Sequence, residues 1–385
     1  MSDASGVTAP GGADNVVETP MLADLRRQAS CLQALGRRHE EFSELGWTRF
    51  GDARHIVAFG SGDGWFAARS AAEYAQIDLG LPYVGASSLE ALGYIVPRLA
   101  RSGLAGIAIS MSGSADRTNE AAEALRNAGE SVLALTNGSG GPLARIADAK
   151  ISLDIEDLAP FLTGTTKYTA TLLGLIMLLE GAAGRSPAAW TRLLGALPAF
   201  LEAAEQFARQ LAARLSGRLP SGVRILSAGP NLATAEYGMA KLIKLLPIPV
   251  WADEVEEFAH RQFWSCPATD LVIYVAANPT VARCACASAA ALGAMDMVTA
   301  AIELPGGSVT AASARLTLPE VPERLSPLFA AIPLQFVGYF LARALGANPD
   351  QSQDVADPAR FRAAQLLSRR GELTGEVPRS KDLAH

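Results

Sequence analysis

The sequence predicts an α/β fold of two similar halves, each a parallel sheet covered by helices on both faces. Short, continuously apolar runs alternate with segments of helical composition, and this alternation is typical of parallel strands buried on both faces. Two of the runs, at residues 55–59 and 104–110, lead through turns rich in Gly and Ser into a helical segment. The second half of the chain repeats this order.

The first half is expected to begin with one or two amphipathic helices over residues 21–50. Its strands are predicted at residues 55–59, 104–110, 131–136 and 150–154. Its other helices are predicted at residues 65–79, 165–180 and 188–215.

The second half is expected to begin with a strand at residues 223–227, a turn at Ala228-Gly229-Pro230-Asn231 and a helix that ends at Leu246. Further strands are predicted at residues 270–276, 297–304 and 314–318, before a closing helix over 325–345. We therefore divide the chain into a tail (1–20), an N-terminal helical segment (21–50), a first domain (51–200), a second domain (201–362) and a C-terminal tail (363–385).

Composition argues against several classes of protein. A net charge of −6 without a Lys- or Arg-rich run argues against nucleic acid, which needs a basic surface. The apolar stretch at residues 172–179 is far shorter than the roughly 20 residues that span a bilayer, so no membrane association is expected. Residues 1–20 lack the pattern of a signal peptide, which predicts a cytoplasmic protein. The four cysteines show no metal-ligand spacing, so we expect them to be small buried side chains, with no metal and no cofactor.

The strongest local signal is Ser110-Met111-Ser112-Gly113-Ser114, which joins a buried strand to a helix. Free N–H groups at a helix start attract a dianion, serine hydroxyls add neutral donors, and Gly113 lets the backbone approach closely. A single serine could merely cap the helix, but the complete unit favours a phosphate. The matching strand of the second half ends at Ala276-Ala277-Asn278-Pro279, without hydroxyls, which predicts one phosphate site per chain.

The chain contains, in this order, the segments Ser110-Met111-Ser112-Gly113, Thr136-Asn137, Gly141-Pro142-Leu143-Ala144, Thr165-Thr166-Lys167, Pro333-Leu334-Gln335 and Asn348-Pro349-Asp350. Together these segments resemble the tandem sugar isomerase (SIS) family, which includes the isomerase half of glucosamine-6-phosphate synthase and related deaminases and deglycases. The resemblance covers about residues 21–360. It implies two tandem SIS domains, which are flavodoxin-like, with a parallel sheet in a three-layer αβα arrangement.

The resemblance also implies site residues. His260, at the end of Glu256-Glu257-Phe258-Ala259-His260, would open the sugar ring from the other subunit of a homodimer, and Glu257 is the acid that precedes it. The residues expected to bind substrate or phosphate are Ser61, Gly62, Asp63, Ser110, Ser112, Gly113, Ser114, Thr163 and Thr165.

The chain departs from the family's pattern at its expected catalytic centre. Lys244 stands in place of the family's catalytic glutamate, and Asp357 in place of its late lysine. Because the two changes are complementary in sign, we hypothesise a reversed ion pair that keeps a catalytic amine and a carboxylate together. Alternatively, Lys244 is a solvated helix lysine and Asp357 caps a short helix. Gly64 and Ala115 replace a serine and a threonine of the phosphate site.

The sequence thus predicts an enzyme that binds a small-molecule sugar phosphate. The reaction would be isomerisation, deamination or deglycation of an amino-sugar or glycated-amine phosphate. Two alternatives stay open. Loss of the glutamate is compatible with a non-catalytic sugar-phosphate sensor. Gly64 and Ala115 are compatible with an enzyme acting on a non-phosphorylated sugar derivative.

Overall fold

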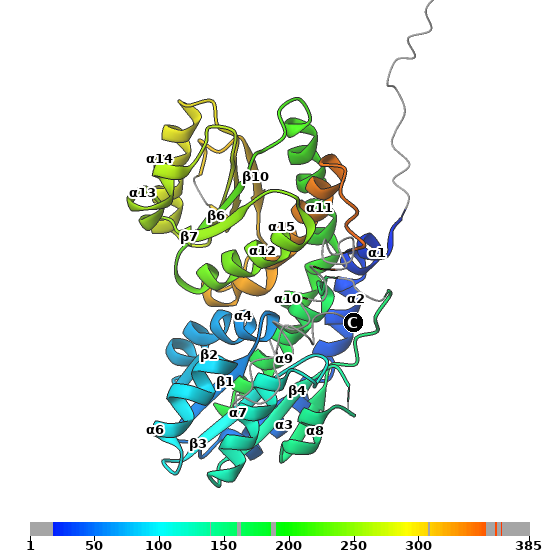
Figure 1. Cartoon of the computed structure of the whole chain (residues 1–385), viewed down its shortest axis with the longest axis vertical. Helices are drawn as coiled ribbons and strands as arrows, with labels where there is room; N and C mark the ends of the chain where they lie inside the picture. The colour runs from blue at the N-terminus through cyan, green and yellow to red at the C-terminus, as the bar shows by residue number, and fades with distance from the viewer. Residues whose placement is uncertain are drawn as a thin grey trace, which may run out of the picture.

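The computed structural model describes residues 18–138, 140–159, 163–185, 190–306 and 309–351, together with the single residues 359 and 363. Two α/β domains are stacked along the long axis of the molecule (Figure 1). Asp357 lies outside the described residues.

Each domain contains a parallel sheet, as the sequence predicts, and each sheet has five strands where four were predicted. The first sheet has the order β2-β1-β3-β4-β5 and the second has the order β10-β9-β8-β6-β7. When the strands of each domain are counted from its own start, both sheets follow the doubly wound order 2-1-3-4-5. The strands are β1 (His55–Gly60), β2 (Tyr83–Ser87), β3 (Leu104–Ile109), β4 (Ser131–Thr136), β5 (Ala149–Ser152), β6 (Val223–Ser227), β7 (Val250–Glu254), β8 (Leu271–Ala276), β9 (Thr299–Glu303) and β10 (Ala314–Thr317).

Helices cover both faces of the two sheets. In the N-terminal part they are α1 (Pro20–Arg26), α2 (Gln28–Gly36), α3 (His39–Phe50), α4 (Asp63–Ser70), α5 (Ser88–Glu90), α6 (Val96–Leu99), α7 (Asp116–Asn127), α8 (Pro142–Ile146) and α9 (Thr166–Ala182), with π-helices at Tyr74–Asp78 and Ala91–Ile95. They continue as α10 (Trp190–Gly195), α11 (Leu197–Leu215), α12 (Leu232–Leu245), α13 (Glu257–His260), α14 (Pro279–Gly293) and α15 (Ser326–Ala344), with 3-10 turns at Gly229–Asn231, Gln262–Ser265 and Glu323–Leu325.

The sequence does not predict β2 or β7, and both strands lie at an edge of their sheet. An edge strand faces solvent along one side, so it lacks the continuous apolar run of a central strand. Asp253 on β7 is only 5% exposed, although it stands in a run of acidic residues in the sequence. The N-terminal segment forms three helices instead of one or two. The helix expected over residues 65–79 ends at Ser70 and is followed by a π-helix.

Helices α9 and α15 are buried almost all round, as helices at the centre of a large protein are. Among the described residues, one helical segment, Glu323–Ala344, is long and apolar enough to cross a membrane, and its most apolar window lies wholly inside the protein. The segment Glu323–Ala344 contains scattered polar residues. It is longer than the uninterrupted apolar stretch at residues 172–179, but it is not itself one uninterrupted apolar run. The four free cysteines are partly exposed, where the sequence predicts burial.

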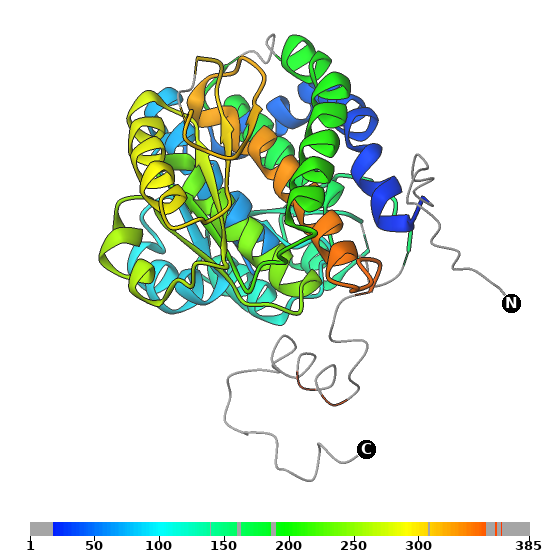
Figure 2. The ribbon, with the colours of Figure 1, turned by 90° about the horizontal axis from the view of Figure 1, so that it is seen from above.

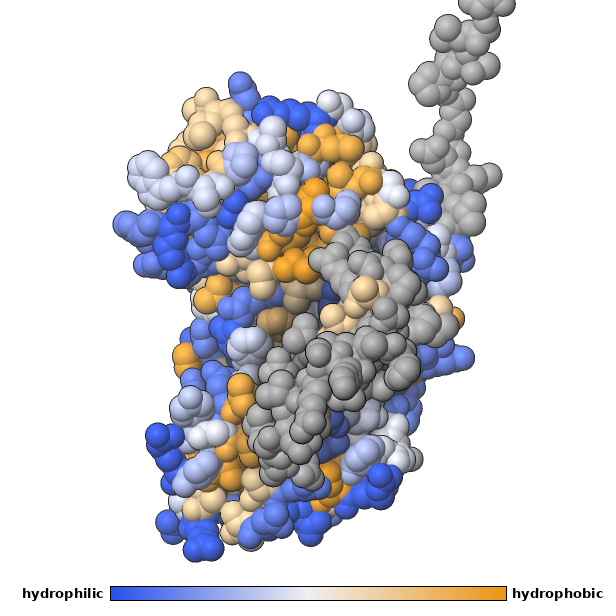
Figure 3. Space-filling model, in the orientation of Figure 1, coloured by the Kyte–Doolittle hydropathy of each residue, from blue (hydrophilic) through white to orange (hydrophobic). Residues whose placement is uncertain are grey.

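Helix α4 of the first domain packs against helix α12 of the second, and both lie at the junction of the domains in Figure 1. In the view from above, the N-terminal helices run beside the long helix α11 (Figure 2), and the ion pair between Arg26 and Glu205 joins them. On the face drawn in Figure 3, hydrophilic and apolar residues are mixed over both domains. The α4–α12 contact is the part of this architecture that shapes the candidate site.

Candidate functional site at the first domain switch

The strand order of the first sheet reverses between β1 and β3. In open parallel sheets, ligands bind outside the carboxyl ends of the strands at such a switch point. The turn after β1 leads into α4, and the loop after β3 leads into α7, so two helix N-termini meet at this edge of the sheet. The sequence-predicted phosphate loop, Ser110 to Ser114, is the second of these two connections.

The turn between β1 and α4 lies unusually close to the end of β3. A side chain at Gly60 or Gly64 would place its Cβ 2.8 or 2.9 Å from the carbonyl oxygen of Ile109. Gly62 adopts a positive φ of 57° immediately before Asp63, the first residue of α4, and glycine reaches this conformation without strain. The turn therefore needs glycine at position 64, which removes the hydroxyl expected there from the family resemblance.

The phosphate loop is held by backbone hydrogen bonds to its neighbours. Ser110 N–H donates to the carbonyl of Leu135 (3.1 Å), and the carbonyl of Gly113 accepts from the N–H of Leu143 (2.9 Å). Gly113 has a φ of 63°, and its N–H donates to the carbonyl of Ser110 (3.0 Å). The loop is thus a fixed turn that holds its hydroxyls in place before a ligand arrives, as a preorganised anion site requires.

These two connections form one side of a cavity of about 450 Å³. The other side consists of Thr163 and Gly164, which precede α9, and of Lys241 and Lys244 on α12 of the second domain. The complete lining is Ser61, Gly62, Asp63, Gly64, Ile109, Ser110, Met111, Ser112, Ala115, Thr163, Gly164, Lys241 and Lys244. Seven residues predicted from the sequence therefore meet in one cavity, namely Ser61, Gly62, Asp63, Ser110, Ser112, Thr163 and Lys244.

An ion pair between the two domains closes the cavity on the α12 side. Lys241 Nζ lies 2.6 Å from Asp63 Oδ2. The Lys241 side chain is only 2% exposed, whereas that of Asp63 is 26% exposed. Burial lowers the pKa of Lys241, and nearby Lys244 lowers it further, while Asp63 opposes both effects. The cavity thus contains a buried amine held by a carboxylate that faces the ligand space.

A buried polar network supports this wall from behind. The Tyr237 hydroxyl, one turn before Lys241, accepts from Gln335 Nε2 (2.8 Å). Gln335 Oε1 accepts from Gln28 Nε2 (2.8 Å), and the Tyr237 ring stacks on Tyr168. Buried polar groups are stable only when they are hydrogen-bonded, so this network fixes α12 against α2, α9 and α15.

Three predicted residues lie beside the cavity and not in its lining. Gly113 is buried behind the loop, and the exposed Ser114 hydroxyl donates to that of Ser112 (3.0 Å). The Thr165 hydroxyl donates to the Asp24 carboxylate of α1, which also accepts from the N–H of Thr166 (3.1 Å). Thr165 therefore anchors the start of α9 to the N-terminal helices.

His260 and Glu257 lie on α13 and do not line the cavity of their own chain. The His260 side chain is 66% exposed, and its Nε2 lies 3.8 Å from Glu256 Oε1. Glu257 lies 3.9 Å from the guanidinium of Arg261. His260 is thus exposed and accessible to a second copy of the chain. Its predicted action in the site of that copy stays a prediction.

The corresponding switch point of the second domain has the opposite charge. Asn278, after β8, donates to the carboxylate of Glu323 (2.6 Å), and Gly229, after β6, approaches the carboxylate of Glu73. Burial raises the pKa of Glu73, and the neighbouring Glu323 raises it further. Two carboxylates would repel a phosphate, so this edge supports the prediction of one phosphate site per chain.

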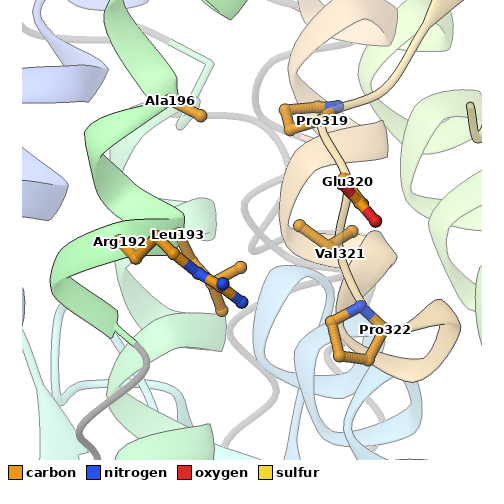
Figure 4. A pocket seen from close by; sticks show the side chains of 7 residues that line it. All are labelled: Arg192, Leu193, Ala196, Pro319, Glu320, Val321 and Pro322. Atoms are coloured by element: carbon orange, nitrogen blue, oxygen red, sulfur yellow. The ribbon is translucent and has the colours of Figure 1, made fainter.

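A larger cavity of about 530 Å³ lies elsewhere, between α10 and the segment after β10. Arg192 and Leu193 extend from α10 toward Val321 and Pro322 across it (Figure 4). Five of its seven lining residues are apolar, and Arg192 and Glu320 are the charged ones. It lies at no strand end and lacks the hydroxyls of a phosphate site, so the smaller cavity at the switch point is the candidate site. No group of three or more His, Cys, Asp or Glu within the described ranges could hold a metal ion.

Lys241 is the site residue that the sequence reasoning missed. It precedes Lys244 by one helical turn on α12, and residues three apart on a helix share a face. That spacing, together with the unusual Asp63 in the glycine-rich turn, was the available signal. What the sequence could not supply was the packing of α4 against α12, which brings the two side chains together.

Comparison with known proteins finds a match to one family model. Residues 50–180 match the SIS domain. Glutamine–fructose-6-phosphate aminotransferase (isomerizing) of Pyrobaculum aerophilum is 28% identical over 263 residues, which cover 65% of this chain and 42% of that protein. The match thus spans less than half the length of this curated relative.

Solved structures share the fold at low sequence identity. The C-terminal domain of glucosamine-fructose-6-phosphate aminotransferase from Francisella tularensis has a TM-score of 0.70 and 18% identity, covering 88% of this chain and 100% of that one. Tagatose-6-phosphate ketose/aldose isomerase from Escherichia coli has a TM-score of 0.70 and 16% identity (88% and 96% covered). Glucosamine-6-phosphate deaminase from Thermotoga maritima has a TM-score of 0.68 and 16% identity (87% and 98% covered).

Proposed function

We propose that this protein, whose residues 50–180 match the SIS domain, is an enzyme that isomerises, deaminates or deglycates a sugar phosphate in the cavity at the first switch point. The observation that carries this proposal is the cavity itself. It joins the hydroxyl-lined start of α7 to a buried Lys241–Asp63 pair from the other domain. A phosphate site and a titratable pair in one cavity are the two parts that sugar-phosphate chemistry requires.

The phosphate would bind to the first domain. Ser110 and Ser112 offer hydroxyls, Ser61 offers another from the neighbouring turn, and the first amides of α7 are free of helical partners. Lys244 adds a positive charge at the cavity. Electrostatic attraction to a dianion is therefore local and does not depend on the negative net charge of the whole chain.

The reacting carbons would lie near Lys241 and Asp63. Isomerisation of an open-chain sugar moves a proton between two neighbouring carbons, which requires a base that later returns the proton. Lys241 is an ammonium while it pairs with Asp63. Burial lowers its pKa, so this ammonium gives up its proton more readily than that of an exposed lysine and becomes the neutral base. Asp63 would stabilise the ammonium that forms when Lys241 takes the proton, and Lys241 would then give it to the adjacent carbon.

Ring opening would need a second copy of the chain. We propose a homodimer in which His260 and Glu257 reach the cavity of the partner, since His260 is largely exposed and does not line its own cavity. The reversed pair of Lys244 and Asp357 is the alternative source of a catalytic amine and carboxylate. Lys244 lines the cavity, and Asp357 lies outside the described residues.

A non-catalytic sugar-phosphate sensor is the second candidate. Within one copy, the ionisable groups among the described lining residues are Asp63, Lys241 and Lys244, and Asp63 is already engaged by Lys241. A site that binds without turnover needs nothing more. Hydroxyl-free Gly64 and Ala115 in the lining favour, in turn, a non-phosphorylated sugar derivative as ligand.

Incubation of the full-length protein with phosphorylated aldoses, ketoses and amino sugars, followed by product analysis, separates these functions. The enzyme is expected to convert at least one of them, and Lys241→Met should abolish the conversion while sugar-phosphate binding persists. Binding without any conversion would establish the sensor. Binding of the unphosphorylated sugar as tightly as its phosphate would establish that the ligand is a non-phosphorylated sugar derivative.

A further inference from the structure

Asp63 is a carboxylate inside a cavity that is otherwise suited to an anion. It is the one acidic residue among the described residues that line this cavity, beside the hydroxyls of Ser110 and Ser112. An acid close to a bound phosphate costs free energy by repulsion. Its position is nevertheless fixed, because Asp63 opens α4 directly after the positive-φ Gly62. A carboxylate held there calls for a positively charged partner.

Lys241 satisfies only part of this requirement. Its ammonium lies 2.6 Å from Oδ2 of Asp63. Oδ1 makes no hydrogen bond or ion pair with any residue that the structure describes. Because Lys241 is buried and Asp63 is partly exposed, the lysine occupies the protein side of the carboxylate. The remaining oxygen is available to a ligand in the cavity.

The charges of the cavity indicate which ligand fits best. Lys241, Lys244 and Asp63 together present two ammonium groups and one carboxylate. A substrate with a phosphate dianion at one end and an ammonium group at the other matches this pattern with opposite signs. A sugar hydroxyl can also donate to a carboxylate, but an ammonium group adds a Coulomb attraction between opposite charges that a neutral hydroxyl lacks.

We propose that Oδ1 of Asp63 binds the ammonium group of the substrate, so that the cavity selects amino-sugar phosphates over sugar phosphates without an amine. This inference rests on the proposed function, since it needs a sugar phosphate in the cavity. It assigns Asp63 to recognition of the amine, whereas the sequence places it among the substrate and phosphate contacts.

The test compares glucosamine 6-phosphate with glucose 6-phosphate, which differ in having an amine or a hydroxyl at one carbon. Isothermal titration of the full-length protein is expected to show at least about tenfold tighter binding of the amino sugar, a difference of about 1.4 kcal/mol. In Asp63→Asn the two dissociation constants should agree within about twofold, because the amide lacks the charge that attracts the ammonium.

Lys241→Met is the matched control, because it breaks the same ion pair from the other side. If Asp63 recognises the amine, Lys241→Met keeps or increases the preference for glucosamine 6-phosphate, while Asp63→Asn loses it. Equal binding of both ligands by the unchanged protein, or an equal loss of preference in both variants, would overturn the inference and leave the proposed function standing. Failure of both sugar phosphates to bind would instead contradict the proposed function.

Discussion

Lys241 of the second domain and Asp63 of the first form an ion pair, 2.6 Å long, in the wall of the candidate site. The pair belongs to a contact that continues along the same two helices, where Arg69 of α4 pairs with Glu236 of α12. The relative position of the two domains therefore determines whether the amine reaches the cavity. This relationship makes the site a property of both domains, although its phosphate loop lies in only one.

Replacing Lys241 and Lys244 one at a time distinguishes the two proposed catalytic centres, the Lys241–Asp63 pair and the Lys244–Asp357 pair. We expect Lys241→Met to lower kcat by about 100-fold or more, the range that a lost general base commonly costs, with less than tenfold change in sugar-phosphate affinity. Lys244→Met should mainly weaken binding, because Lys244 contributes charge to the cavity. Steady-state kinetics checks both variants. The opposite pattern, with kcat lost only in Lys244→Met, would favour the reversed pair with Asp357.

Mixing two inactive variants tests whether the site is shared between subunits. At a substrate concentration well below the dissociation constant of the serine variant, His260→Ala and the double variant Ser110→Ala/Ser112→Ala should each show almost no activity as homodimers. After mixing under conditions that exchange subunits, activity should return, since a mixed dimer contains one cavity with intact serines facing an intact histidine. Sedimentation analysis verifies that dimers form. If exchange occurs without any recovery of activity, His260 does not act in the partner's site.

The segment that carries His260 depends on a buried arginine. Arg224 pairs with Asp270 (3.0 Å), donates to Gln262 (3.1 Å) and to the carbonyl of Ser265 (3.1 Å), and its guanidinium lies over the ring of Trp251. Arg224→Met should destabilise the protein by about 3–5 kcal/mol, because it leaves the carboxylate of Asp270 buried and unpaired. Chemical denaturation measures this loss.

The double variant Arg224→Met/Asp270→Leu is the control for that measurement. It removes both charges, so it should recover part of the lost stability. If the double variant is less stable than Arg224→Met, the loss of stability comes from losing the Arg224–Asp270 ion pair and not from leaving the Asp270 carboxylate unpaired.

A buried glutamate should give the stability of the first domain a particular dependence on pH. Glu180 accepts from the Tyr74 hydroxyl and from Trp190 Nε1, each at 2.7 Å, and burial raises its pKa above the usual 4.5. The folded state therefore holds a proton that the unfolded state releases between 4.5 and the raised pKa. Stability from this group is complete below that window and falls as the pH rises through it.

Glu180→Gln should remove this fall, because the amide does not titrate. Denaturation curves at a series of pH values, compared between the two proteins, check the prediction. Identical slopes of the unfolding free energy against pH in both proteins would contradict it.

The central strands and the phosphate loop could be predicted from the sequence because their signals are local. Residues 131–136 and 223–227 match the bounds of β4 and β6, since a central parallel strand is mostly apolar, with Arg224 as the charged exception in β6. The edge strands β2 and β7 escaped prediction because they carry Gly85, Asp253 and Glu254. The link between Lys241 and Asp63 joins residues 178 positions apart, and no local pattern reports such a contact.

The central claim is that a phosphate binds where β3 meets α7. Isothermal titration with glucosamine 6-phosphate and with inorganic phosphate tests it most directly, on the unchanged protein, on Ser110→Ala/Ser112→Ala, and on Ser216→Ala, whose exposed hydroxyl lies outside the cavity. Loss of two hydrogen bonds to a charged group should weaken the binding of both ligands by about 100-fold, with no change in Ser216→Ala. Unchanged affinity in the double serine variant would contradict the account.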